Sequence, residues 1–61
     1  MRNAESLIHT SVTDCMTTLQ FWGPDDLAEL EKALQMACDL GHKSRAIVIG
    51  RRIRAIKKEA K

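Results

Sequence analysis

Apolar residues recur at helical spacing in the middle of the chain. The stretch begins at Gly23-Pro24-Asp25-Asp26, where a proline at the first helical position and two acids in the first turn are typical of a helix start. The apolar positions that follow lie on one helical face: Leu27, Leu30, Leu34, Ala37 and Cys38. Ala33, Met36 and Leu40 widen this face, so we expect it to contact two neighbours. Gly41 suits a left-handed C-cap, and the pattern predicts a helix over residues 24–40.

A second helix is predicted over residues 44–59. Ser44 is a good N-cap, and the apolar residues after it form one narrow stripe: Ala46, Ile49, Ile53, Ile56 and Ala60. Gly50 weakens this helix by about 1 kcal/mol relative to Ala, and we expect it to permit a close approach of another backbone. Because the turn between the two helices is short, we expect an antiparallel helical hairpin.

The N-terminal third fits two structures. One apolar series has spacings of four, three, four and three, and predicts a helix over residues 4–22: Ile8, Val12, Cys15, Leu19 and Trp22. Four threonines within it disfavour a helix, and residues 17–22 alternate loosely enough for a short strand. The longer series favours the helix. The whole chain, residues 1–61, is therefore predicted to be a single all-α domain with an N-terminal helix followed by the hairpin.

The size of the chain limits its core. A chain of 61 residues buries only about 60% of its unfolded surface, and dimerisation is a common way to enlarge a small core. We expect a homodimer in contact through the broad face of residues 24–40 and the apolar turn at residues 46–49. No apolar run approaches the roughly 20 residues that span a bilayer, and the N-terminus lacks a signal-peptide pattern. We therefore expect a cytoplasmic protein without membrane contact, with Cys15 and Cys38 reduced.

Charge divides the chain into two parts. Residues 1–41 have a net charge of −5, residues 42–61 have a net charge of +7, and the whole chain has only +2. Four of the bases lie on the helical face opposite the isoleucine stripe: Arg51, Arg54, Lys58 and Lys61. A basic face of this kind is typical of a polyanion site or a contact with an acidic protein surface, although charged faces often serve only solubility.

These bases are the candidate partner-binding residues. An acidic groove of another protein is the first expected partner, and Phe21, Trp22, Ile47 and Val48 are candidate apolar anchors or dimer contacts. A nucleic-acid backbone is the second, contacted by the same bases. The helix has no aromatic side chain on which single-stranded bases would stack.

Catalytic and metal chemistry find little support. Cys38 and His42 are four residues apart, but Gly41 is expected to end the helix between them. His9, Cys15, Cys38 and His42 show no close pair of the kind found in zinc sites. The three glycines are not clustered, so no phosphate-cradling loop is predicted. We expect a protein that is not an enzyme and binds no cofactor or metal.

From about Thr17 the chain resembles the ribbon-helix-helix repressors. The matching features are the stretch Thr18-Leu19-Gln20-Phe21, the helix start at Pro24, Leu40-Gly41, Ser44-Arg45, and the isoleucines at 49 and 53. In that family a dimeric strand pair enters the major groove, which implies base contacts from Thr18 and Gln20 and phosphate contacts near Ser44 and Arg45. The chain departs from the family in the 16 residues before the strand and in Trp22-Gly23 before the proline. Residues 40–47 also resemble the turn of a tetratricopeptide repeat, but no second copy occurs.

The sequence therefore favours a small non-enzymatic regulator that binds a partner protein and inhibits or modulates it. Compact single-domain proteins of this type are frequent among phage and mobile-element products, and we expect such an origin. The alternative is a dimeric DNA-binding repressor of ribbon-helix-helix type, with a short strand at residues 17–22.

Overall fold

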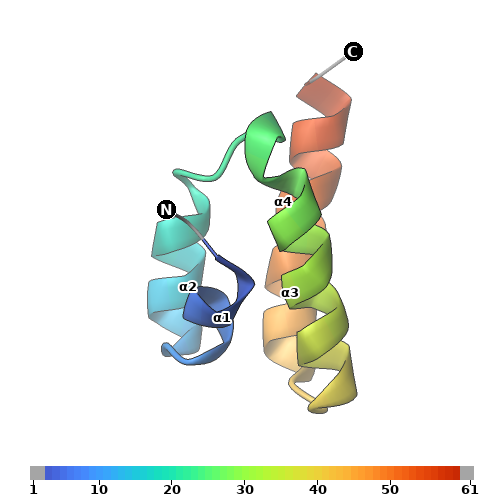
Figure 1. Cartoon of the computed structure of the whole chain (residues 1–61). Helices are drawn as coiled ribbons and strands as arrows, with labels where there is room; N and C mark the ends of the chain where they lie inside the picture. Colours follow the sequence, from blue (N-terminus) through green and yellow to red (C-terminus); the bar gives the residue numbers. More distant parts are fainter. Residues whose placement is uncertain (1–2, 60–61) are drawn as a thin grey trace.

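The computed structural model describes residues 3–59, and all regular structure in this range is helical (Figure 1). Residues 3–59 form four α-helices and one 3₁₀ helix in this order: α1 (Ala4–Ile8), α2 (Val12–Leu19), η1 (Pro24–Asp26), α3 (Leu27–Asp39) and α4 (Lys43–Glu59). The predicted all-α class is confirmed for this part of the chain. Within the described residues no strand forms, so the alternative with a strand at 17–22 is wrong.

The helix predicted over residues 4–22 is in fact two helices. Asn3 caps α1, accepting a hydrogen bond from the Ser6 backbone N–H at 3.0 Å. Ser11 begins α2 in the same way, because its hydroxyl accepts from the Asp14 N–H at 3.1 Å. An N-cap residue must leave the helical conformation, and Ser11 has an extended backbone with ψ of 160°. The chain therefore breaks at residues 9–11 and starts a new helix.

The second helical stretch begins and ends with defined caps. Residues 24–26 form a 3₁₀ turn before α3, and the Gly23 N–H donates to Asp26 Oδ2 at 2.9 Å. At the other end Gly41 has φ of +75°, its N–H donates to the Cys38 carbonyl, and the His42 N–H donates to the Ala37 carbonyl. This pair of bonds is a Schellman motif, which satisfies carbonyls that the helix leaves open. The C-cap predicted at Gly41 is thus present.

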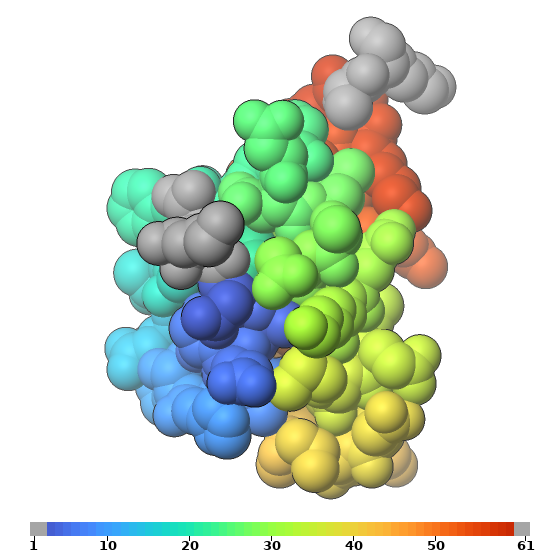
Figure 2. Space-filling view, in the orientation of Figure 1, coloured from blue at the N-terminus to red at the C-terminus, as the bar shows by residue number. Residues whose placement is uncertain are grey.

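The helices pack in two layers (Figure 1). Helices α3 and α4 lie side by side, α1 packs on α3, and α2 packs on α4. In the space-filling view the side chains of α1 abut those of α3 (Figure 2). One apolar core joins the four α-helices of residues 3–59: Ala4, Leu7, Ile8, Cys15, Leu19, Trp22, Leu30, Ala33, Ala37, Ile49, Ile53 and Ile56. The broad face of α3 contacts α1 and α4 of the same chain, which accounts for the two neighbours expected of it.

Side chains from α3 and α4 hold the short helix α1 at both ends. Glu29 of α3 accepts a hydrogen bond from the Ala4 N–H at 3.2 Å. Arg45 of α4 donates from Nη1 to the Leu7 carbonyl at 2.9 Å. A five-residue helix has no stability of its own in water, so these contacts and the buried Leu7 and Ile8 maintain it.

Candidate functional site on the outer face of α4

The candidate site begins with a row of exposed side chains on α4. Ile47, Arg51, Arg54 and Lys58 are spaced by four, three and four residues, which places them along one face of the helix. All four are exposed, and the buried Ile49, Ile53 and Ile56 occupy the opposite side. We call Arg51, Arg54 and Lys58 the basic face. Lys61, predicted as its fourth member, lies outside the described residues.

Within residues 3–59, the side chains of the basic face make no hydrogen bond and no ion pair. The other two arginines of α4 differ. Arg52 donates from Nε and Nη2 to the Trp22 carbonyl at 3.2 and 2.8 Å, and Arg45 donates to the Leu7 carbonyl. Both are half-buried and hold the N-terminal helices against α4.

Arg45 was a predicted DNA contact, and the structure assigns it an internal role instead. Lys57 also has an internal partner, because its ammonium lies 3.2 Å from Glu31 Oε1 of α3. Both side chains of this pair are more than half exposed, so the pair contributes little stability. The described bases of α4 therefore differ in their contacts. Arg45, Arg52 and Lys57 have partners within the chain, whereas the side chains of Lys43 and of the basic face have none among the described residues.

The four predicted apolar anchors differ in how far they are exposed. Phe21 is 67% exposed and Ile47 is 56% exposed, so both are available to a partner. Trp22 is 1% exposed and belongs to the core, which contradicts its prediction as a surface anchor. The backbone N–H of Trp22 donates to the Leu19 carbonyl at 3.1 Å in a tight turn after α2, and the indole that follows this turn is buried. Val48 is half-buried against the core.

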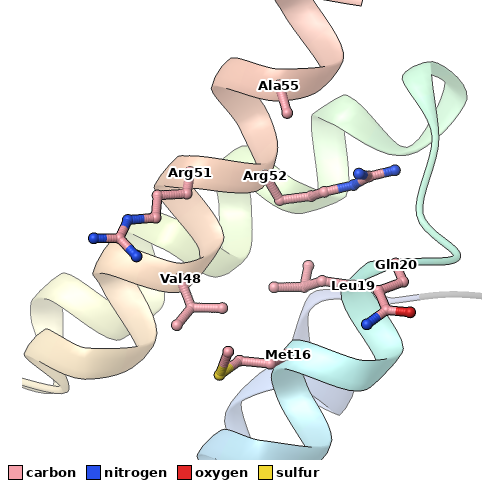
Figure 3. A pocket seen from close by; sticks show the side chains of 7 residues that line it. All are labelled: Met16, Leu19, Gln20, Val48, Arg51, Arg52 and Ala55. Carbon is pink, nitrogen blue, oxygen red and sulfur yellow. The ribbon is translucent and has the colours of Figure 1, made fainter.

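A groove runs between α2 and α4 beside the basic face (Figure 3). Its volume is about 280 Å³, and both helices line it: Met16, Leu19, Gln20, Val48, Arg51, Arg52 and Ala55. In Figure 3 the side chains of Met16, Leu19 and Val48 point into the space between the helices, and Arg51 points away from them. The groove is mainly apolar within and has arginine on one border.

Sequence reasoning missed this groove. Met16 is 53% exposed and lies off the apolar series of its helix, where a methionine gives no signal of its own. Ala55 is equally inconspicuous. A groove between α2 and α4 appears only when the packing of those two helices is known.

The residues implied by the ribbon-helix-helix resemblance lie apart. Thr18 is in the last turn of α2 and Gln20 follows that helix, so neither belongs to a strand. Ser44 lies inside α4, which begins at Lys43, so Ser44 is not the N-cap that the sequence predicted. The Ala46 N–H donates to the His42 carbonyl, and α4 thus starts one residue earlier than expected. Among the described residues there is no β-ribbon, so these four residues do not form the DNA-binding surface that the resemblance implies.

The cysteines and histidines do not gather into one site. Cys15 is fully buried, and burial raises the pKa of its thiol while nearby Arg45 lowers it by less. Cys38 is exposed, although its spacing had placed it on the apolar face of α3. Among the described residues, no group of three or more His, Cys, Asp or Glu side chains is arranged to hold a metal ion.

None of the helices described for this chain combines the length and the apolar character that crossing a bilayer requires. Comparison with known proteins gives no relatives: no family model matches the chain, and neither the curated proteins nor the solved structures include a significant match.

Proposed function

We propose that this chain is a small non-enzymatic regulator that binds an acidic surface of a partner protein through α4 and thereby blocks or modulates that partner. The observation that carries the proposal is the contrast among the arginines of one helix. Arg45 and Arg52 are engaged internally, whereas Arg51 and Arg54 extend into solvent together with Lys58. The fold leaves these three charges without a structural task.

The geometry of the basic face suits a protein partner. Lys58 lies seven positions after Arg51, or about 10 Å along the helix, which matches a short acidic segment of another protein. Ile47 continues the same row and offers an exposed apolar contact. Opposite charge would steer the encounter, and the apolar contact would add to the lifetime of the complex.

Gly50 lies beside this row, and its lack of a side chain leaves space there for a partner. A Cβ added at Gly50 would meet no atom within 4 Å. The close backbone approach expected at Gly50 is therefore not made inside the chain. The open space next to Ile47 supports an approach by a second molecule.

A repressor of ribbon-helix-helix type is no longer a candidate, because residues 17–19 are helical and 20–22 form a turn and its exit. Nucleic acid is retained only as an outcome of the experiment, through phosphate contacts by the same three bases. A solvated face without any partner is the other outcome.

The experiment is affinity capture from a lysate with immobilised chain, in parallel with and without nuclease. The test variant is Arg51→Glu with Arg54→Glu. The matched control is Lys32→Glu with Lys57→Glu, which changes the net charge equally at exposed bases on α3 and on the side of α4 that faces α3. Circular dichroism should show that both variants keep the helical fold.

The proposal predicts that the chain captures a protein with or without nuclease. The control variant should capture the same protein, and the test variant should not. Capture that disappears with nuclease would identify nucleic acid as the partner. If the test variant captures the same proteins as the unaltered chain, the basic face serves solubility and the proposal fails.

A further inference from the structure

The groove between α2 and α4 lies next to the basic face, and Arg51 belongs to both. The inner surface of the groove is apolar. Leu19 forms a buried part of it, Val48 and Ala55 are half-buried, and Met16 is more than half exposed at the edge. An unbranched methionine adapts its shape to an incoming side chain, which suits a recognition surface.

Two arginines border this apolar surface in different states. The two hydrogen bonds from Arg52 to the Trp22 carbonyl fix its guanidinium as one wall. In Figure 3 Arg52 extends from α4 towards the segment that follows α2, whereas Arg51 projects into solvent. A ligand that enters the groove therefore meets one unengaged cation at its border.

The size of the groove indicates the kind of ligand. Its volume of about 280 Å³ lies just below the roughly 300–1,000 Å³ of small-molecule sites, and the groove is open along the two helices. It accommodates one or two apolar side chains that project from a longer segment. An amphipathic helix that lies in a groove contributes anchors of this kind, three or four residues apart.

A second copy of the chain does not fit as the occupant. In a two-fold dimer through this face, the basic faces of the two copies would meet each other, and like charges oppose such contact. The acidic helix α3 offers no free apolar face either, because Leu30, Ala33 and Ala37 are buried against the neighbouring helices of its own chain.

We infer that the groove between α2 and α4 receives an acidic amphipathic helix of another protein, with apolar side chains against Met16, Val48 and Ala55 and a carboxylate on Arg51. This inference rests on the proposed function and names the form of the partner. The apolar contact gives the complex its specificity, and the basic face gives it electrostatic attraction.

The direct test is a nuclear magnetic resonance titration of the ¹⁵N-labelled chain with a synthetic probe. The probe is a helical peptide with leucines at four- and three-residue spacing, flanked by glutamates. Its control has every glutamate replaced by lysine. We expect the amide shifts to concentrate at Met16, Gln20, Val48 and Ala55, and the lysine peptide to cause none of them. Shifts centred on another surface, equal binding of the lysine peptide, or no binding at all would overturn the inference.

Groove variants separate this inference from the proposed function. Met16→Gln replaces an exposed apolar side chain with a polar one of similar length, and Ala55→Leu fills the groove without adding polarity. Leu40→Gln is the matched control, because Leu40 is 59% exposed and lies outside the groove lining. We expect each groove variant to weaken capture of the partner at least about tenfold and the control to leave it unchanged. If Arg51→Glu with Arg54→Glu abolishes capture while both groove variants capture normally, the proposed function stands and the groove inference fails.

Discussion

Arg51 and Arg52 are adjacent in the sequence, but their guanidinium groups face different surroundings. One helical step of 100° turns Arg52 towards the segment after α2, where it donates twice to the Trp22 carbonyl. The same step leaves Arg51 in solvent beside the groove. Both side chains are identical, so the role of each depends on the face of α4 that it occupies.

Arg52 is predicted to be a stability residue. Arg52→Ala removes both hydrogen bonds to the Trp22 carbonyl and should lower the free energy of unfolding by about 1–3 kcal/mol. Arg51→Ala is the control and should change it by less than about 0.5 kcal/mol, as is usual at exposed positions. Urea unfolding followed by circular dichroism measures both. Equal effects of the two substitutions would contradict the role given to Arg52.

The two thiols should differ in reactivity. Cys38 is exposed and should react promptly with an aromatic disulfide reagent, whereas Cys15 should react only when the chain unfolds. A spectrophotometric count should therefore give one thiol in the native chain and two in denaturant. Prompt reaction of both thiols in the native chain would contradict the burial of Cys15.

Cys15 also gives a prediction for alkaline pH. Because burial raises its pKa in the folded state, the unfolded chain releases the thiol proton first as the pH rises. The folded state then holds more protons, so the free energy of unfolding falls above the ordinary thiol pKa. Cys15→Ala should remove this part of the alkaline loss in unfolding curves recorded across that range. An unchanged alkaline slope in the variant would argue against it.

The helical elements differ in how far the sequence predicts them. The stretch that became η1 and α3 was predicted closely, because its start, its periodicity and its C-cap are local features. The break between α1 and α2 was missed, since the apolar series continues through it with Ile8 and Val12. Ser11 decides the break, yet a serine preceded by a threonine signals equally a cap or an ordinary polar position.

Gly50 lowers the stability of α4, and no close packing within the chain requires a glycine at this position. Gly50→Ala should raise the free energy of unfolding by about 0.5–1 kcal/mol, because the added methyl meets no atom and alanine favours the helix. Gly41→Ala provides the contrast and should be destabilising, since Gly41 has φ of +75°. Thermal or urea unfolding measures both signs. A loss of stability in Gly50→Ala would contradict the open space around that position.

Across the whole molecule, the acidic residues before position 42 and the basic residues after it have several different roles. Glu29 holds the start of α1 and Asp26 holds the turn before α3, so part of the acidic excess is structural. Arg45 and Arg52 are the corresponding structural bases. The sequence predicted which face of α4 is basic, because helical periodicity fixes that face. It did not predict which bases are engaged, since their partners are distant in sequence: backbone carbonyls for Arg45 and Arg52, and the Glu31 carboxylate for Lys57.

The homodimer expected from the sequence also belongs to this scale. It was expected from the small size of the chain, with the broad face of residues 24–40 and the apolar turn at residues 46–49 as contacts. Helices α1 and α4 of the same chain cover the buried part of the first of these surfaces. We therefore expect the isolated chain to sediment as a monomer of 6.9 kDa at micromolar concentration. Sedimentation equilibrium measures the mass, and a value twice as large would restore the homodimer.

The central claim is that the basic face of α4 binds an acidic protein surface. The most direct test is isothermal titration calorimetry. The purified, nuclease-treated partner is titrated with the chain and, separately, with its Arg51→Glu, Arg54→Glu variant. We predict that the variant binds at least about tenfold more weakly, a difference of 1.4 kcal/mol, and that the Lys32→Glu, Lys57→Glu control keeps its affinity. Equal dissociation constants for the unaltered chain and the Arg51→Glu, Arg54→Glu variant would contradict the claim.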